Sequence, residues 1–331
     1  MTAGRLVASA RAYARELYFL LLIPPLWAAA RVASVARLLG AGAYRFTIDA
    51  LIHLSNLLVH PLSGELRALR SASRDLRTYW KTYDGADLEL YAAAVGKPDW
   101  FVGRRILDFG CGVGRKPFEL ARRGAAEVLG IDASSRSIAV AREMAEELPN
   151  LRFESCLAED LDSRHEALFD DVVSFTVFEH VADVASALAQ IHRLLRPGGR
   201  AVIVFQHYDD RYGSHLKEFV HHPWPQLMFP EQALFRFWNR RLESAHARGG
   251  MGYFPAGYRH GFDGHNRDCF MNLNRLSVEQ FEACVERSGL RLASELFYSR
   301  SPLLARFPLL GRSPLASHLR GSVAYVLEKP A

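Results

Sequence analysis

Cysteine is scarce in this chain, and the few cysteines are far apart. Cys111, Cys156, Cys269 and Cys284 are the four thiols among 331 residues, and no two of them form a CxxC pair. Disulfide frameworks and structural zinc sites need cysteines at closer, paired spacing. The sequence therefore predicts neither disulfides nor a bound metal, and it favours a reducing compartment such as the cytoplasm.

Acidic residues are also rare near the N-terminus. Residues 1–81 hold eleven basic and four acidic residues, a net charge of +7, whereas residues 82–331 carry −2. Nucleic-acid binding needs a basic surface around the site, so the nearly neutral remainder of the chain argues against nucleic acid as a partner. The basic segment is also the most apolar one, which indicates an anionic membrane surface.

The chain has no uncharged run as long as a membrane span. Residues 17–30 are uncharged, but these 14 residues fall short of the roughly 20 that a spanning helix needs. Pro24 and Pro25 are expected to break a helix there, and helical spacing of apolar residues resumes after Arg31. Residues 1–80 thus predict a helical appendage with two interpretations: contact with the inner face of a membrane, or packing on the core or a second subunit of a homodimer.

Beyond the appendage, apolar runs alternate with helical patterns, as in stacked β-α-β units. Strands are expected at 104–109, 126–132, 151–156, 169–175 and 199–206, helices at 115–124, 134–148 and 183–195, and a turn at 196–199. Ser134 or Ser135 is expected to cap the second of these helices. Such strands form a doubly wound, mostly parallel α/β sheet, which binds ligands at the carboxyl ends of its strands.

The segment from Ile106 to Lys116 reads ILDFGCGVGRK and places an acid and three alternate glycines after the first strand. Glycines there permit positive φ and let a ligand approach the main chain. The spacing differs from the GxGxxG fingerprint, and an adjacent acid disfavours a pyrophosphate. A cationic ligand without phosphate fits better, and S-adenosylmethionine (SAM) carries both an ammonium and a sulfonium group.

The motifs along this part of the chain resemble those of the class I SAM-dependent methyltransferases. The matching segments are DFGCGVGR (108–115), IDAS (131–134), AED (158–160), FDDVVSFTVFEHVAD (169–183) and LLRPGGRAVIVF (194–205), and residues 273–292 and 321–330 are similar to the family's final helix and closing β-hairpin. The resemblance implies a Rossmann-like, seven-stranded domain over residues 81–331, with SAM as cofactor and a small-molecule acceptor.

The same resemblance implies the cofactor-binding residues. Asp132 would accept both ribose hydroxyls, and an acid or amide of the third motif would read the adenine amino group. The implied set is Asp108, Gly110, Cys111, Gly112, Gly114, Asp132, Ala133, Glu159, Asp160 and Phe175.

These shared residues hold the cofactor, so the acceptor and the base must be bound elsewhere. Residues 207–272 form a long insertion rich in histidine and aromatic residues, which we expect to be a substrate cap. His207, His215 and His222 are the candidate general bases, because an imidazole with a pKa of about 6.5 suits removal of a hydroxyl proton at neutral pH.

Glu179 and His180 resemble a pair in ubiquinone-biosynthesis O-methyltransferases, some of which bind a divalent ion with it and an earlier glutamate. Thr176 occupies that earlier position, so no metal is expected, and the pair would brace the next helix. The predicted function is methyl transfer from SAM to a hydroxyl of a lipid, quinone or lipid-linked sugar. The alternatives are N- or C-methylation of a polar metabolite or glycan, and a non-catalytic SAM-binding scaffold.

Overall fold

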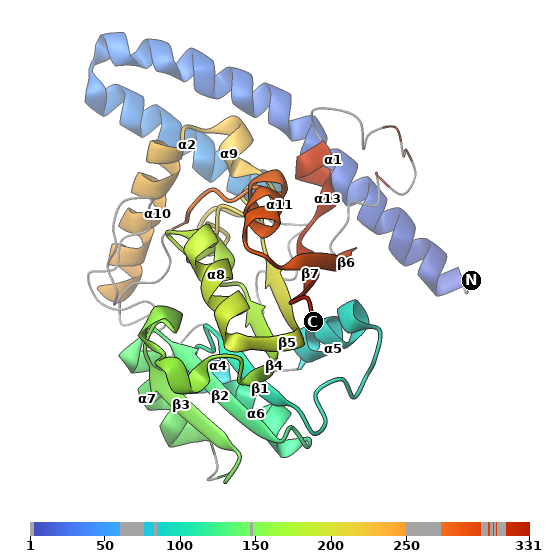
Figure 1. Cartoon of the computed structure of the whole chain (residues 1–331). Helices are drawn as coiled ribbons and strands as arrows, with labels where there is room; N and C mark the ends of the chain where they lie inside the picture. The colour runs from blue at the N-terminus through green and yellow to red at the C-terminus, as the bar shows by residue number, and fades with distance from the viewer. Residues whose placement is uncertain are drawn as a thin grey trace. The chain divides into compact units, whose positions relative to one another are not determined.

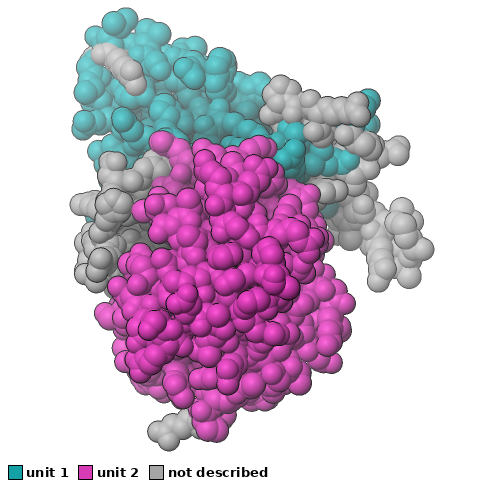
Figure 2. Space-filling model, in the orientation of Figure 1, with its two compact units in different colours: residues 1–74, 208–260, 299–321 teal, residues 75–207, 261–298, 322–331 magenta. Residues whose placement is uncertain are grey.

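The computed structural model describes residues 3–59, 76–82, 85–145, 148–248, 273–298 and 316–331, with residues 304, 307 and 309. The chain divides into two compact units (Figure 2). The first unit comprises residues 1–74, 208–260 and 299–321, and the second comprises residues 75–207, 261–298 and 322–331. The end of the predicted cap, residues 249–272, lies outside the described residues.

A seven-stranded sheet forms the centre of the second unit (Figure 1). Its strands are β1 Arg105–Phe109, β2 Glu127–Asp132, β3 Leu151–Ser155, β4 Phe169–Phe175, β5 Leu195–Phe205, β6 Arg291–Phe297 and β7 Val323–Glu328. They lie in the order β3-β2-β1-β4-β5-β7-β6, in which β1 to β5 pair in parallel and β7 pairs antiparallel with both β5 and β6. The predicted doubly wound, mostly parallel sheet is confirmed, and the carboxyl ends of β1 to β5 share one edge.

Helices cover both faces of this sheet, because successive side chains of a strand point to opposite sides. Ile106 and Val202 face the apolar residues of α5 and α6, whereas Leu107 and Ile203 face those of α8 and α11. The helices of this unit are α4 Leu76–Lys81, α5 Ala86–Val95, α6 Arg115–Arg122, α7 Ser135–Met144, α8 Val184–Leu194 and α11 Val278–Arg287, with short 3₁₀ helices η3 Ala158–Asp160, η4 Ser163–His165 and η5 Phe178–His180.

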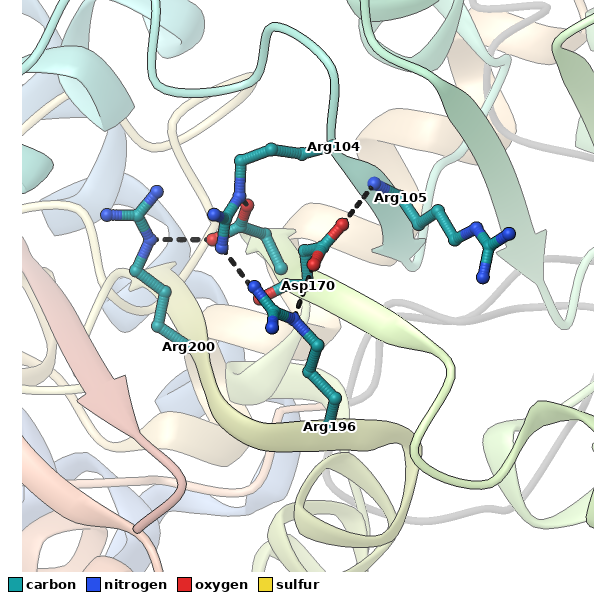
Figure 3. Close-up of polar contacts among 6 residues, drawn as sticks. Arg104, Arg105, Asp170, Arg196 and Arg200 are labelled. Atoms are coloured by element: carbon teal, nitrogen blue, oxygen red, sulfur yellow. Dashed lines mark hydrogen bonds and ion pairs between the residues drawn. The ribbon is translucent and has the colours of Figure 1, made fainter. Parts of the chain in front are cut away.

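An ion-pair cluster joins the amino ends of β1, β4 and β5 (Figure 3). Asp171 is fully buried, and its carboxylate pairs with Arg104 and with Arg200, whose Nε lies 2.6 Å from Oδ1. The neighbouring Asp170 pairs with Arg196. The negative charge of Asp171 is thus compensated by arginines of the same chain. This cluster lies at the amino edge of the sheet, opposite the carboxyl edge where ligands are expected.

The first unit is helical. It contains α1 Ala3–Ala33, the 3₁₀ helix η1 Ser34–Leu39, α2 Ala41–Val59, α9 Pro225–Met228, α10 Glu231–His246 and α13 Ala316–Arg320. Phe19 of α1, Val59 of α2, Trp224 and Leu319 form its shared apolar cluster. Segments from the predicted appendage, the predicted cap and the stretch before β7 therefore build one core.

Two predictions of local structure are wrong. The turn expected at 196–199 belongs to β5, where the register against β4 shifts between Phe169 and Asp171 and Gly198 has a φ of 72°. Between these two register pairs β5 has four residues and β4 has one, so β5 is an irregular strand that bulges by three residues at the positive-φ Gly198 without ending the pairing.

The expected break of the N-terminal helix is the second wrong prediction. α1 continues through Pro24 and Pro25, and both prolines are exposed. Each proline removes one N–H from the helix, and on an exposed side water can satisfy the carbonyls that lose their partners. The opposite side of α1 packs on the apolar cluster of the first unit, which stabilises the helix despite the prolines.

Candidate cofactor and active site

The loop after β1 consists of three glycines with positive φ, of 77° at Gly110, 56° at Gly112 and 80° at Gly114. A Cβ at Gly110 would lie 2.3 Å from Val177 Cγ2, and one at Gly114 would lie 2.6 Å from Ala141 Cβ. A Cβ at Gly112 would meet no atom of the chain within 4 Å. Packing therefore requires the outer two glycines, and the middle one leaves main chain open to a ligand.

Asp132, at the end of β2, fixes the shape of this loop. Its carboxylate accepts hydrogen bonds from the amides of Gly112 and Ser134, both at 2.8 Å, and the Cys111 amide donates to the Ile131 carbonyl at 2.9 Å. Burial raises the pKa of Asp132, and the two amide bonds oppose that shift. Each carboxylate oxygen keeps a second lone pair, so Asp132 can still accept from a diol.

The remaining predicted cofactor residues follow the next strands along the same edge. Ala133 comes directly after β2, Glu159 and Asp160 lie in η3 after β3, and Phe175 ends β4. The Asp160 carboxylate accepts the Leu157 amide at 2.9 Å and so caps η3, whereas Glu159 is exposed. All ten predicted residues therefore belong to the second unit and to the strand ends where a doubly wound sheet binds ligands.

Asp108 is the most unusual of these residues. It is fully buried, and neither carboxylate oxygen accepts a hydrogen bond from any residue that the structure describes. Burial raises the pKa of Asp108 to about 6, while the nearby ammonium of Lys116 lowers it. A buried carboxylate without donors is costly for a folded protein, which indicates a ligand that brings its own cation.

Lys116 lies close to the same place. Its Nζ is 3.7 Å from Asp87 Oδ2 and 5.5 Å from the centroid of the Phe175 ring. Asp108, Asp132 and Asp87 thus outnumber the one cation that acts on Asp108, so this end of the sheet favours a positively charged ligand. SAM fits these residues: an ammonium for Asp108, a ribose diol for Asp132, and close approach to the main chain at Gly112.

The three candidate histidines are divided between the units. His207 follows β5 in the second unit and is fully buried, whereas His215 and His222 belong to the first. The His222 ring lies 5.9 Å from the ring of Phe19, its Nδ1 donates to the Pro223 carbonyl, and burial lowers its pKa to about 4. So weak a base suits removal of a hydroxyl proton poorly, and the surroundings of His222 therefore support it less well as a general base.

Glu179 has a property that its position in the sequence did not reveal. It lies in η5, shortly after β4, and its side chain is buried. Burial raises the pKa of Glu179 to about 8. An acid that titrates near neutral pH at a strand end is a candidate for proton transfer. The segment VFEHV placed Glu179 at this edge, but only the burial shows its altered pKa.

The strand order with its antiparallel β7, the acid before the glycine loop and the second acid after β2 together define the class I SAM-dependent methyltransferase fold. Residues 107–203 match the family described as a methyltransferase domain. The second unit is therefore a class I SAM-dependent methyltransferase domain, and SAM is its cofactor, as the sequence predicted.

The curated relatives that match this domain include ubiquinone biosynthesis O-methyltransferases. The one from Alkalilimnicola ehrlichii is 44% identical over 101 residues, which cover 30% of this chain and 40% of the relative. The one from Aeromonas salmonicida is 37% identical over 132 residues, which cover 38% of this chain and 55% of the relative. The chain thus spans about half the length of these relatives or less. The crystal structure of a SAM-dependent methyltransferase from Mesorhizobium loti is 19% identical, covers 73% of this chain and 97% of its own, and has a TM-score of 0.45.

Proposed function

We propose that this chain is an O-methyltransferase that uses SAM to methylate a hydroxyl group of an apolar or amphipathic acceptor of the quinone, lipid or lipid-linked sugar class, in the cytoplasm. The buried Asp108, without a hydrogen-bond donor among the described residues and close to the open main chain of Gly112, carries the SAM-dependent part of the proposal. The names of the relatives support the hydroxyl and the quinone class.

SAM, when bound, supplies an electrophilic methyl group on its positively charged sulfur. Asp108 would hold the ammonium group and Asp132 the ribose hydroxyls, which orients the methyl group toward an acceptor at the strand ends. The acceptor hydroxyl loses its proton as its oxygen takes the methyl group, and His207 would receive that proton. Glu179, whose burial raises its pKa to about 8, holds its own proton at pH 7 and would act near the strand ends as a neutral hydrogen-bond donor.

The test is a transfer assay with methyl-labelled SAM and a hydroquinone or catechol acceptor. His207→Ala is expected to lower kcat by roughly a hundredfold or more, the usual contribution of a general base, with SAM affinity unchanged. His192→Ala, in the last turn of α8, is the matched control and should retain activity. Normal turnover of His207→Ala would exclude this histidine as the base, and the same comparison at His215 and His222 would then test the other two candidates.

Two further measurements separate the alternatives. A transfer rate that stays flat across the titration range of histidine would favour N- or C-methylation, in which less proton removal precedes transfer. With a cell extract as acceptor source, label in the organic phase supports the lipid or quinone class, and label only in the aqueous phase points to a glycan or polar metabolite. SAM binding without transfer to any fraction would indicate a non-catalytic scaffold.

A further inference from the structure

A continuous apolar stripe runs along the exposed side of α1. Leu17, Leu21, Pro24, Ala28 and Val32 follow one another at intervals of three or four residues, and all are exposed, Leu21 by 65% and Val32 by 71%. Residues at this spacing lie on one face of a helix. Over residues 14–33 of α1, the exposed face is therefore mostly apolar.

The next elements repeat this pattern. Phe46, Ala50, Leu54 and Leu57 form an exposed stripe along α2, again at intervals of three or four residues, with Phe46 77% exposed. Leu38, in the 3₁₀ helix between α1 and α2, is 86% exposed. We call these two stripes and Leu38 the outer face of α1–η1–α2. Exposed apolar residues that gather along neighbouring elements in this way are typical of an interaction site.

The charges near the outer face are all positive. Between residues 17 and 48 the only charged residues are Arg31, Arg37 and Arg45. The guanidinium of Arg31 lies 5.1 Å from the centroid of the Trp27 ring, at the border of the stripe. The next acid along the chain, Asp49, pairs with two arginines of α10 instead. Apolar side chains bordered by arginine and tryptophan are typical of helices at a membrane surface.

The inner side of α1 limits how this helix can meet a membrane. Residues Ala14–Ala33 have the length and hydropathy of a membrane span. However, Glu16 on the inner side is buried and pairs with Arg211 at 3.0 Å, and Phe19 packs in the cluster with Trp224 and Leu319. A spanning α1 would lose these contacts and bring Glu16 toward hydrocarbon, whereas a helix lying flat on the surface keeps them.

We propose that the outer face of α1–η1–α2 docks the protein flat on a membrane surface that contains anionic lipids. The apolar stripes would contact the acyl region, and Arg31 and Arg45 would lie among the lipid phosphates. A second copy of the chain fits this face less well, because two outer faces brought together would oppose their arginines, while Asp49 of each copy already pairs with two arginines of α10. The inference is independent of the proposed methyl transfer, since docking needs neither SAM nor an acceptor.

The test is flotation of the full chain with vesicles of phosphatidylcholine, with and without phosphatidylglycerol. Wild type is expected to float with the anionic vesicles and to be released by high salt, since part of the attraction is electrostatic. Val32→Glu and Phe46→Glu should each weaken binding roughly tenfold, because each removes apolar contact and adds repulsion. Val102→Glu is the matched control: Val102 is 54% exposed in the second unit, and its replacement should leave flotation unchanged.

Three results would overturn the proposal. Wild type that fails to float, with an oligomer by light scattering that Val32→Glu dissociates, would make the outer face a dimer interface. Equal flotation of wild type and both outer-face variants would place membrane binding elsewhere. Retention in membranes after alkaline carbonate extraction would assign α1 as a span. Thermal unfolding and SAM affinity, measured for every variant, should match those of wild type.

Discussion

Two buried aspartates on neighbouring strands of one sheet have opposite surroundings. Asp108 on β1 and Asp171 on β4 are both fully buried, and in the parallel register Asp108 lies opposite Val173, two residues after Asp171. Asp171, at the amino edge, is compensated by Arg104 and Arg200, both labelled in Figure 3. Asp108, at the carboxyl edge, accepts no hydrogen bond from the described residues, and its pKa is raised to about 6.

The difference indicates that Asp171 stabilises the fold, whereas Asp108 serves to bind a ligand. A buried charge with partners inside the chain contributes to the folded state, and removal of one partner is strongly destabilising. A buried charge without partners costs stability, which a cationic ligand can recover as binding energy. The parallel sheet places the two kinds of residue at opposite edges, and variants at these positions should therefore change different properties.

The largest effect is expected for the stability of Asp171→Asn. Loss of this charge leaves Arg104 and Arg200 without their buried carboxylate, which should lower the free energy of unfolding by about 3 kcal/mol or more. Denaturant titration measures this loss. SAM affinity of the protein that stays folded at low temperature should equal that of wild type. A variant as stable as wild type would show that the cluster contributes nothing net to the fold.

Asp108→Asn should show the reverse pattern. SAM affinity is expected to fall roughly a hundredfold, because the ammonium loses a buried counter-charge, and calorimetry or equilibrium dialysis measures it. The free energy of unfolding at pH 7 should rise, by up to about 3 kcal/mol, since a carboxyl whose pKa is higher in the folded state destabilises that state once ionised. Unchanged SAM affinity would refute the assignment of Asp108 as the ammonium site.

The sequence predicts the local elements on which this contrast rests, but it does not predict the surroundings of the two aspartates. The strand at 169–175, the glycine loop and the Ser134 cap, whose Oγ accepts the Ser137 amide, were predicted from local patterns. Local patterns suffice there because turn glycines and caps act on their own neighbours. The glycine bulge in β5 depends instead on the register against β4, which no short segment encodes.

The ion pairing and the pKa values of the acids could not be predicted, because they also depend on residues that are distant in the sequence. Asp108 and Asp171 both read as acids in apolar strands, and only the sheet brings Arg104 and Arg200 to one of them. Glu179 reads as one acid of a short motif, and its raised pKa follows from burial by residues distant in the sequence. The unbroken α1 depends on Trp224 and Leu319, roughly two and three hundred positions away in a chain of this size.

A smaller effect is expected from pH alone. Because burial holds the pKa of Asp108 at about 6, above its ordinary value, the carboxyl is ionised at pH 7 and becomes protonated as the pH falls through 6. A protonated carboxyl no longer attracts the ammonium, so SAM affinity should fall by about tenfold between pH 7 and pH 5. Asp108→Asn is the control and should remove this dependence. A flat wild-type profile would place the pKa of Asp108 well below 5 in the folded protein.

The smallest effect is expected for Lys116, whose ammonium is the positive charge of the chain that acts on the Asp108 carboxyl. Its ammonium lowers the pKa of Asp108, so Lys116→Met should raise that pKa further and move the pH midpoint of SAM binding upward. At pH 7 the loss of affinity should be only severalfold, because the Lys116 ammonium pairs mainly with Asp87, 3.7 Å away. Lys97→Met, at an exposed position in the same unit, is the matched control and should leave both affinity and midpoint unchanged. Tighter SAM binding by Lys116→Met would mean that the Lys116 ammonium repels the cofactor. Lys116 would then offset part of the attraction between the Asp108 carboxylate and the ammonium of SAM.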